Sequence, residues 1–322
     1  MKKITKIKPF GKQTPWAWAI EPVHGCNLRC GHCSTRLYEP GIRQFMTKET
    51  WINTFTIIKE VSPTCRVDLC LSGEPTLHPD LLEFLEIARK ISPLSQIQIT
   101  TNGTILASGK LTHKQLLEAG ANIIYVDMYS PKELHIKLAE ESGYEYYEYY
   151  KNQDKQHLSP WTYHGPELKL IVLQEQPDNW PISRYRAGLL GTWYNHLDWE
   201  AAKKYGLKPV TQPLTRRCNQ PFIYVPIHYS GNYLLCCQDN WGETAGLLGS
   251  VNIRGVEGFK NYWFGKEMQT IRRRLRQKNR ADTSYCSRCC ITFSRCDFKH
   301  WTDEQVQVYY DGEKWRDMDD KS

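Results

Sequence analysis

No run of apolar residues in this 322-residue sequence approaches the length of about 20 residues that a membrane-spanning helix needs, which excludes a transmembrane segment. The basic N-terminus, Met1 to Gly11, lacks the apolar region of a secretory signal. Without export the protein is expected in the cytoplasm, where thiols stay reduced, so its 12 cysteines are not expected to form six disulfides. The cysteine count instead favours metal or iron-sulfur ligation.

No cysteine occurs between Cys70 and Cys218, so the cysteines are clustered rather than spread through the chain. The three groups are Cys26, Cys30 and Cys33; Cys65 and Cys70; and Cys218, Cys236, Cys237, Cys286, Cys289, Cys290 and Cys296. Neighbouring pairs such as Cys236-Cys237 suit disulfides poorly, because bridging adjacent residues strains the backbone. The clustering predicts two separate metal sites in two domains.

Short apolar runs alternate with helical patterns in the first two thirds of the chain. The strand-like runs are Trp16–Glu21, Arg66–Leu71, Gln96–Thr101, Asn122–Met128 and Glu167–Leu173. The helical patterns cover Thr47–Val61, Pro79–Lys90 and Thr112–Ala119, with Thr47 suited to a cap and Gly120 to a stop. Strands that alternate with helices predict a parallel α/β sheet or barrel, with ligands at the carboxyl ends of the strands.

After Pro209 the residue pattern changes to short runs that are interrupted by glycine and cysteine. We expect an N-terminal extension over residues 1–15, a core domain over 16–205, a cysteine-rich domain over 206–300 and a solvated, charged tail over 301–322. The aromatic and acidic segment Tyr144–Tyr150 (YEYYEYY) is predicted as a surface loop or helix, with a stacking platform as the alternative.

Residues 26–33 read CNLRCGHC and follow the first predicted strand directly. Three thiolates in one short loop can hold three irons of a 4Fe-4S cluster and leave the fourth iron without a protein ligand. An open coordination position is where substrate or cofactor chemistry takes place. The alternative is a structural zinc site, for which His24 or His32 would supply a fourth ligand.

The CNLRCGHC loop resembles the signature of the radical SAM superfamily, with His32 where the family prefers an aromatic residue. Two further segments, Ser72–Pro75 and Thr100–Gly103, resemble family motifs and lie at the ends of successive predicted strands, and Asp127–Ser130 lies at the end of the next strand. The first of these resembles Gly-Gly-Glu-Pro, with Ser72 in place of a glycine. The resemblance implies that Cys26, Cys30 and Cys33 hold a 4Fe-4S cluster that binds S-adenosylmethionine.

The same resemblance implies the residues that contact the cofactor. The backbone near Gly73 and the Glu74 carboxylate would contact its methionine amino group, Asn102 would lie near it, and Ser130 would line its ribose side. The reduced cluster would cleave S-adenosylmethionine to a 5′-deoxyadenosyl radical that removes hydrogen from a C–H bond. Strand alternation from Glu74 would place Cys70 on the same side, where it would return a hydrogen atom; the alternative is a thiol that fills core space.

The second cysteine group resembles the SPASM and twitch extensions of radical SAM enzymes, which hold auxiliary 4Fe-4S clusters. The twitch pattern is satisfied by Cys218, Cys236, Cys286 and Cys289. Four thiolates would close this cluster and make it an electron relay or a structural element. Cys237, Cys290 and Cys296 remain as alternate ligands, no role is assigned to His300, and a zinc ribbon is the alternative kind of site. The resemblance implies a partial (β/α)6 barrel, similar to a TIM barrel, followed by a small cysteine-rich domain.

Much of the net charge of +7 lies within nine residues that contain Arg272, Arg273, Arg274, Arg276, Lys278 and Arg280. Met268, Ile271 and Leu275 recur there at helical spacing, which predicts an amphipathic helix over residues 266–280 with a solvated basic face. The alternative is a contact surface for nucleic acid or an acidic peptide.

The motifs together predict a radical SAM enzyme that modifies a peptide or another large, tethered substrate by oxidation, crosslinking, epimerisation or rearrangement. A nucleobase in DNA or RNA, or a small molecule, is the alternative substrate. Such an enzyme would take its electrons from a partner such as flavodoxin or ferredoxin. A non-catalytic zinc or iron-sulfur protein that binds nucleic acid is the alternative from another class, although it leaves Glu74 and Asn102 unexplained.

Overall fold

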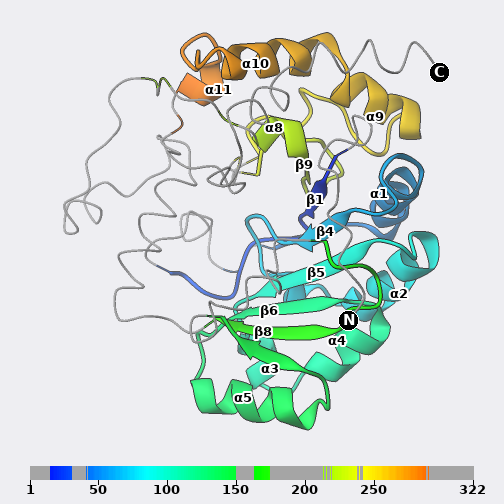
Figure 1. Ribbon diagram of the computed structural model, residues 1–322, viewed down its shortest axis with the longest axis vertical. Helices are drawn as coiled ribbons and strands as arrows, with labels where there is room; N and C mark the ends of the chain where they lie inside the picture. The colour runs from blue at the N-terminus through cyan, green and yellow to red at the C-terminus, as the bar shows by residue number, and fades with distance from the viewer. Residues whose placement is uncertain are drawn as a thin grey trace.

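Seven parallel strands form the main sheet in the computed structural model (Figure 1). Their order is β7 (Tyr146–Glu148), β8 (Leu170–Gln174), β6 (Ile123–Asp127), β5 (Gln96–Thr101), β4 (Arg66–Leu69), β1 (Ala17–Ile20) and β9 (Tyr224–Ile227). The structure describes residues 15–30, 41, 43–149, 163–174, 213, 215, 218, 220–237, 239, 242–287 and 289. Within these residues the sheet ends at β7 on one side and β9 on the other, which confirms the predicted partial barrel and adds strands to it.

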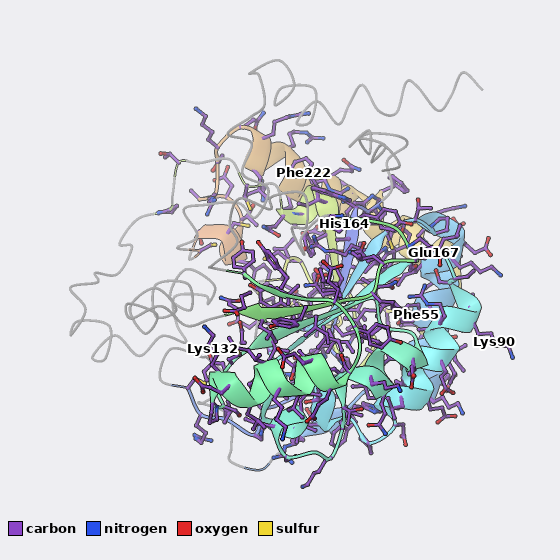
Figure 2. The ribbon with its side chains drawn as sticks, turned by 60° about the horizontal axis from the view of Figure 1, so that its bottom comes forward. Phe55, Lys90, Lys132, His164, Glu167 and Phe222 are labelled. Atoms are coloured by element: carbon purple, nitrogen blue, oxygen red, sulfur yellow. The ribbon has the colours of Figure 1, made fainter. Side chains whose placement is uncertain are left out.

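Helices from the crossover connections cover one face of the sheet. They are α1 (Lys48–Val61), α2 (Leu81–Ile91), α3 (Thr104–Ala107), α4 (His113–Ala119) and α5 (Lys132–Glu141). Apolar side chains of α1 and α2 pack in one core with Trp18 and Val67 from the sheet, because every second strand residue points toward the helices. Phe55 of α1 is buried in this core, whereas Lys90 of α2 points away from the molecule (Figure 2).

The opposite face of the sheet carries polar as well as apolar side chains, and we call it the inner face. A small apolar cluster of Ile123, Tyr125, Tyr147, Leu170 and Val172 occupies one part of it. On β4 and β5, Asp68 and Gln98 are register partners and lie side by side on this face. Both are fully buried, at 0% exposure. Polar groups buried on the inner face of a barrel are unusual for a plain core and suit a binding surface.

The cysteine-rich part of the chain joins the same sheet. β9 pairs in parallel with β1, from Ala17 opposite Tyr224 to Ile20 opposite Ile227. The helices that the structure describes beyond this edge (Figure 1) are α8 (Gln220–Ile223), α9 (Gly255–Trp263), α10 (Lys266–Arg276) and α11 (Ser284–Ser287). The predicted boundary at residues 205–206 and the predicted tail at 301–322 lie outside the described residues, as do residues 1–14.

The five predicted strands and three predicted helices of the core are all present. Thr47 caps α1, and a capping box of Thr112 and Gln115 opens α4, which ends at Gly120. The helix predicted from Pro79 begins at Leu81 instead. No helix among the described residues is long and apolar enough to cross a membrane.

Two expectations about surface segments were wrong. The segment predicted as a surface loop or helix contains β7, whose Tyr147 is 5% exposed and packs on the inner face. The basic face of α10 is not fully solvated, because Arg272 is buried at 7% exposure. Its Nε donates to the Pro221 carbonyl at 2.8 Å, and its guanidinium lies 4.1 Å from the centre of the Trp263 ring. An arginine can be buried in this way when backbone carbonyls and an aromatic face replace water.

Candidate active site and auxiliary cluster site

The predicted catalytic motifs meet at the carboxyl ends of neighbouring strands. The loop with Cys26 and Cys30 follows β1 and the short strand β2 (Val23–His24), which pairs with β3 (Gln44–Phe45). The Gly73-Glu74 turn follows β4, and Asn102 follows β5. Since these three strands are adjacent and parallel, their ends share one edge of the sheet, where α/β barrels build active sites.

Gly73 holds its turn directly against the cysteine-bearing segment. A Cβ atom at Gly73 would lie 1.6 Å from the Val23 carbonyl oxygen and 2.6 Å from the Val23 carbonyl carbon. The next residue reinforces this contact, because the Glu74 backbone N–H donates to the Gly25 carbonyl at 3.0 Å. Only glycine allows this approach, so Gly73 positions the loop that carries Cys26.

The Glu74 carboxylate is 3% exposed and accepts four hydrogen bonds from the protein. Oε1 accepts from the Thr76 N–H at 3.1 Å, the Thr76 hydroxyl at 2.6 Å and the Thr101 hydroxyl at 2.7 Å. Oε2 accepts from the Asn102 N–H at 2.8 Å. Glu74 also caps the short 3₁₀ helix η2 (Pro75–Leu77). The carboxylate thus fixes the ends of β4 and β5 to each other.

Burial raises the pKa of the Glu74 carboxyl, although the hydrogen bonds from Asn102, Thr76 and Thr101 act in the opposite direction. An ionised carboxylate has about four acceptor positions, and Oε2 accepts one bond from the described residues. A cation at Oε2 would therefore find a free acceptor and would relieve the cost of burying the charge.

A second network joins Asn102 to the cysteine loop. The Asn102 Nδ2 lies 3.5 Å from the Cys26 Sγ and 3.0 Å from the Asn27 Oδ1, and the Leu28 N–H lies 3.3 Å from the same Sγ. The Asn27 Nδ2 donates in turn to the Thr104 hydroxyl at 2.7 Å. Donors aimed at a sulfur atom favour its thiolate form, which is the form that ligates iron.

Several of these partners were missed by the sequence predictions. Thr76, Thr101 and Asn27 all lie within or beside the recognised motifs, so their proximity in sequence was the available signal. Their hydrogen bonds with Glu74 and Asn102 depend on how the strand ends meet, which no motif records.

The remaining predicted residues of the catalytic site are Cys70, Ser130 and Cys33. Cys70 is half-buried just after β4, and its N–H donates to the Ile20 carbonyl at 3.0 Å. Leu71 has a φ of +92°, so the strand alternation used to align Cys70 with Glu74 ends at this point. Ser130 is half-buried between β6 and α5. Cys33 lies outside the described residues.

The auxiliary cysteines come together beyond β9. Nine of the cysteines lie in the part of the chain that the structure describes. Those at 218, 236, 286 and 289 are close enough for their charges to interact: Cys236 is affected by Cys289, Cys218 and Cys286. Cys237 adjoins them, with its Sγ 3.3 Å from the Gln220 Oε1. Cys290, Cys296 and His300 lie outside the described residues.

Arg280 is a further residue of this group that the sequence predictions treated as solvated. It is 3% exposed, and its charge opposes the effect of burial on Cys218 and Cys286. Burial nevertheless raises the pKa of Cys218 to about 11 and raises that of Cys286 further. Buried thiols of this kind become thiolates when they bind a metal ion or cluster, so the donor set fits an iron-sulfur group with Arg280 beside it.

Models of known protein families match both the segment with the strand-end motifs and the segment with the auxiliary cysteines. The model for the radical SAM superfamily matches residues 20–154, and the model for an iron-sulfur cluster-binding domain, SPASM, matches residues 218–290. The first segment contains the Cys26, Glu74 and Asn102 networks, and the second contains the cysteines beyond β9. These two domains imply a 4Fe-4S cluster with S-adenosylmethionine and auxiliary iron-sulfur clusters, and the thiols described above fit them.

Similar proteins share parts of the sequence or the fold. The 7,8-dihydro-6-hydroxymethylpterin dimethyltransferase of Methanocaldococcus jannaschii is 33% identical over 124 residues, which cover 37% of this chain and 23% of that enzyme. The GTP 3′,8-cyclase of Haemophilus influenzae is 31% identical over 131 residues, which cover 40% of this chain and 38% of the cyclase. The matched stretch therefore spans well under half of either relative.

The fold is similar to that in the crystal structure of BtrN in complex with AdoMet and 2-DOIA. The TM-score is 0.58 at 17% sequence identity, with 87% of this chain and 93% of that chain covered. At this identity the likeness concerns the fold alone. The family models, the strand-end motifs and the clustered thiols agree with one another. The chain belongs to the radical SAM superfamily and is an enzyme with a SPASM-type iron-sulfur domain.

Proposed function

We propose that this enzyme cleaves S-adenosylmethionine reductively at a cluster held by Cys26, Cys30 and Cys33, and that it removes hydrogen from a substrate C–H bond. When bound, the cluster and S-adenosylmethionine supply the radical chemistry, and the protein supplies orientation and exclusion of water. The observation that carries the proposal is the buried Glu74 carboxylate, which has a free acceptor position on Oε2 beside the Asn102–Cys26 network.

In this proposal each residue of the network has a distinct task. The Glu74 Oε2 accepts a hydrogen bond from the methionine ammonium group, which also balances the buried negative charge. Asn102 holds both the Glu74 carboxylate, through its N–H, and the Cys26 sulfur, through its amide. Gly73 keeps the two loops in contact. Ser130 is proposed to line the ribose side, and Cys70 to return hydrogen.

Replacing Glu74 by glutamine should weaken the binding of S-adenosylmethionine by about 10- to 100-fold, because a hydrogen bond to a charged group contributes about 1.5–3 kcal/mol. The substitution keeps the side-chain shape and removes the charge. The measurement is equilibrium binding of S-adenosylmethionine to the anaerobically reconstituted enzyme, together with methionine release under reduction.

The matched control is Glu83→Gln, since Glu83 is an exposed carboxylate of α2 that pairs with Lys48 at the surface. It should leave both binding and methionine release unchanged. Unaltered affinity in Glu74→Gln would refute the assigned role of Glu74. A fully iron-loaded wild type that releases no methionine would refute the proposed reaction itself.

We also propose that Cys218, Cys236, Cys286 and Cys289 hold one auxiliary 4Fe-4S cluster. Replacing both Cys286 and Cys289 by alanine should then remove about four irons per chain, because the two remaining thiolates are fewer than the three with which the catalytic site holds its cluster. Iron analysis of the reconstituted protein measures this loss. Cys65→Ala is the control, because Cys65 lies in the apolar core at 2% exposure and should retain all iron. Bound zinc in place of iron at this site would contradict the assignment.

A peptide or another large, tethered substrate is the first candidate, because the SPASM/twitch enzymes that this chain resembles act most commonly on ribosomally made peptides. A cytoplasmic electron donor such as flavodoxin or ferredoxin would supply the electrons, whether the substrate is a peptide or another molecule. The nucleic-acid alternative has less support, because Arg272 and Arg280 of the basic segment are buried.

A compact polar molecule is the second candidate, favoured by unpaired groups on the inner face. Both amide atoms of Gln98 and the hydroxyl of Thr100 are buried and have no hydrogen-bond partner within the described part of the chain. Buried polar atoms are normally paired, so a polar ligand on this face would satisfy them. The relatives named for a pterin and for GTP fit this class. Stimulation of methionine release by heterocycles, or instead by peptides, decides between the candidates.

A further inference from the structure

Three side chains that no motif connects meet at the edge of the active-site end of the sheet. Glu21 follows β1, His24 ends β2, and His228 follows β9. The backbone sets this arrangement: β1 and β9 are parallel neighbours, and the Glu21 N–H donates to the Ile227 carbonyl at 3.0 Å. We call these residues the Glu21–His24–His228 cluster.

The distances within the cluster suit a shared metal ion. The His24 Nδ1 lies 3.0 Å from the Glu21 Oε1, and the His228 Nε2 lies 3.7 Å from the Glu21 Oε2. One ligand atom from each of the three residues falls within 4.8 Å of the others. Ligands at the usual zinc distances of about 2.0–2.2 Å in a tetrahedral site stand about 3.3–3.5 Å apart, between the two measured values. Small side-chain movements would close the set around one ion.

Neighbouring side chains hold the imidazoles of His24 and His228 in fixed orientations, as the ligands of a metal ion must be held. The His228 Nδ1 lies 2.8 Å from the Ser230 hydroxyl, and the Asn232 Nδ2 donates to the same hydroxyl at 2.9 Å. This partner fits the tautomer that leaves the lone pair of His228 Nε2 facing Glu21. The Tyr229 ring packs on both imidazoles, with ring centres 5.4 Å from His24 and 4.3 Å from His228.

Space beside His228 depends on a glycine. A Cβ atom at Gly242 would lie 3.0 Å from the His228 Nε2, and Gly242 also has a φ of +67°.

The Glu21 carboxylate is deeply buried, since Glu21 is 1% exposed. A buried carboxylate between two imidazoles, at 3.0 and 3.7 Å, is stabilised by a cation in the same place.

We propose that the Glu21–His24–His228 cluster binds one divalent first-row transition-metal ion such as Zn²⁺ or Fe²⁺. Two imidazoles and one carboxylate form the ligand set of catalytic zinc and non-haem iron sites, and three protein ligands leave a position open to water or to a substrate atom. The ion lies at the active-site edge, because His24 is two residues before Cys26. It also joins the segment matched by the radical SAM model to the segment matched by the SPASM model.

The test uses the iron-loaded holoenzyme after removal of loosely bound metal with a chelator, and Zn²⁺ as the probe. Calorimetric titration and elemental analysis should show about one zinc per chain, with the iron content unchanged. His228→Gln and Glu21→Gln should each weaken zinc binding by at least about 100-fold, since each removes a ligand. Two variants are used so that the proposal is still tested if one of them fails to fold.

His164→Gln is the control. His164 lies before β8 (Figure 2), and its N–H donates to the side chain of Gln96 at the amino end of β5, whereas the cluster follows the carboxyl ends of β1 and β9. This variant should bind zinc as the wild type does. No zinc binding by the wild type, equal binding by His228→Gln, or zinc that enters only as iron leaves would each overturn the proposal. Methionine release measured in parallel reports separately on the proposed function.

Discussion

Gly73→Ala is expected to slow methionine release from S-adenosylmethionine by at least about 100-fold and to reduce iron at the catalytic cluster, because overpacking displaces the cysteine loop. The added methyl group would stand 1.6 Å from the Val23 carbonyl oxygen and 3.0 Å from the Gly25 carbonyl oxygen. Both contacts are backbone atoms, so no side-chain rotation can relieve them. The strand pair β2–β3 or the Gly73-Glu74 turn must move, and either movement separates Glu74 from Gly25.

Iron analysis and methionine release in the reconstituted variant measure this effect. Gly109→Ala is the control, because a Cβ atom at Gly109 meets nothing within 4 Å, although its φ of +72° imposes a backbone cost of about 1 kcal/mol. The control should keep its iron and its rate while losing some stability. A Gly73→Ala enzyme with full iron and a normal rate would show that the close approach does not hold the loop.

Asp68→Ala is expected to cause the largest loss of stability, about 3–5 kcal/mol in the free energy of unfolding, because it removes the carboxylate that pairs with the buried Arg66 guanidinium. The two side chains form a two-point ion pair, with Nε to Oδ1 at 2.8 Å and an Nη to Oδ2 at 2.9 Å. The Tyr224 hydroxyl donates to Asp68 at 3.0 Å and ties β9 to the pair. Asp68 and Arg66 are 0% and 4% exposed.

Anaerobic thermal unfolding should show a fall in Tm of about 5 °C or more for Asp68→Ala. The double variant Arg66→Met/Asp68→Leu should recover much of this loss, because it removes both buried charges and fills their space with apolar side chains. Lys48→Met breaks the exposed pair with Glu83 and should change stability by less than about 1 kcal/mol. Equal losses in Asp68→Ala and Lys48→Met would contradict the importance given to burial.

The local patterns in the sequence determined much of this molecule. The strands from Trp16, Arg66, Gln96, Asn122 and Glu167 and the cap at Thr47 follow from apolar periodicity and side-chain capping, which act over a few residues. The three strand-end motifs were predicted to meet because parallel neighbours bring their carboxyl ends to one edge. The cysteine spacings pointed to two iron-sulfur sites, in keeping with the two family models.

Only the tertiary structure decided which distant residues touch. It brought His228 to Glu21 across 207 positions because β9 pairs with β1, an arrangement that no local pattern specifies. It buried Arg272 against Trp263 and Arg280 beside the auxiliary thiols, where a helical pattern alone predicts exposed charge. It also pressed Gly73 onto Val23. Sequence determines local conformation through short-range sterics and periodicity, whereas contacts between distant residues depend on which strands become neighbours and how closely their ends pack.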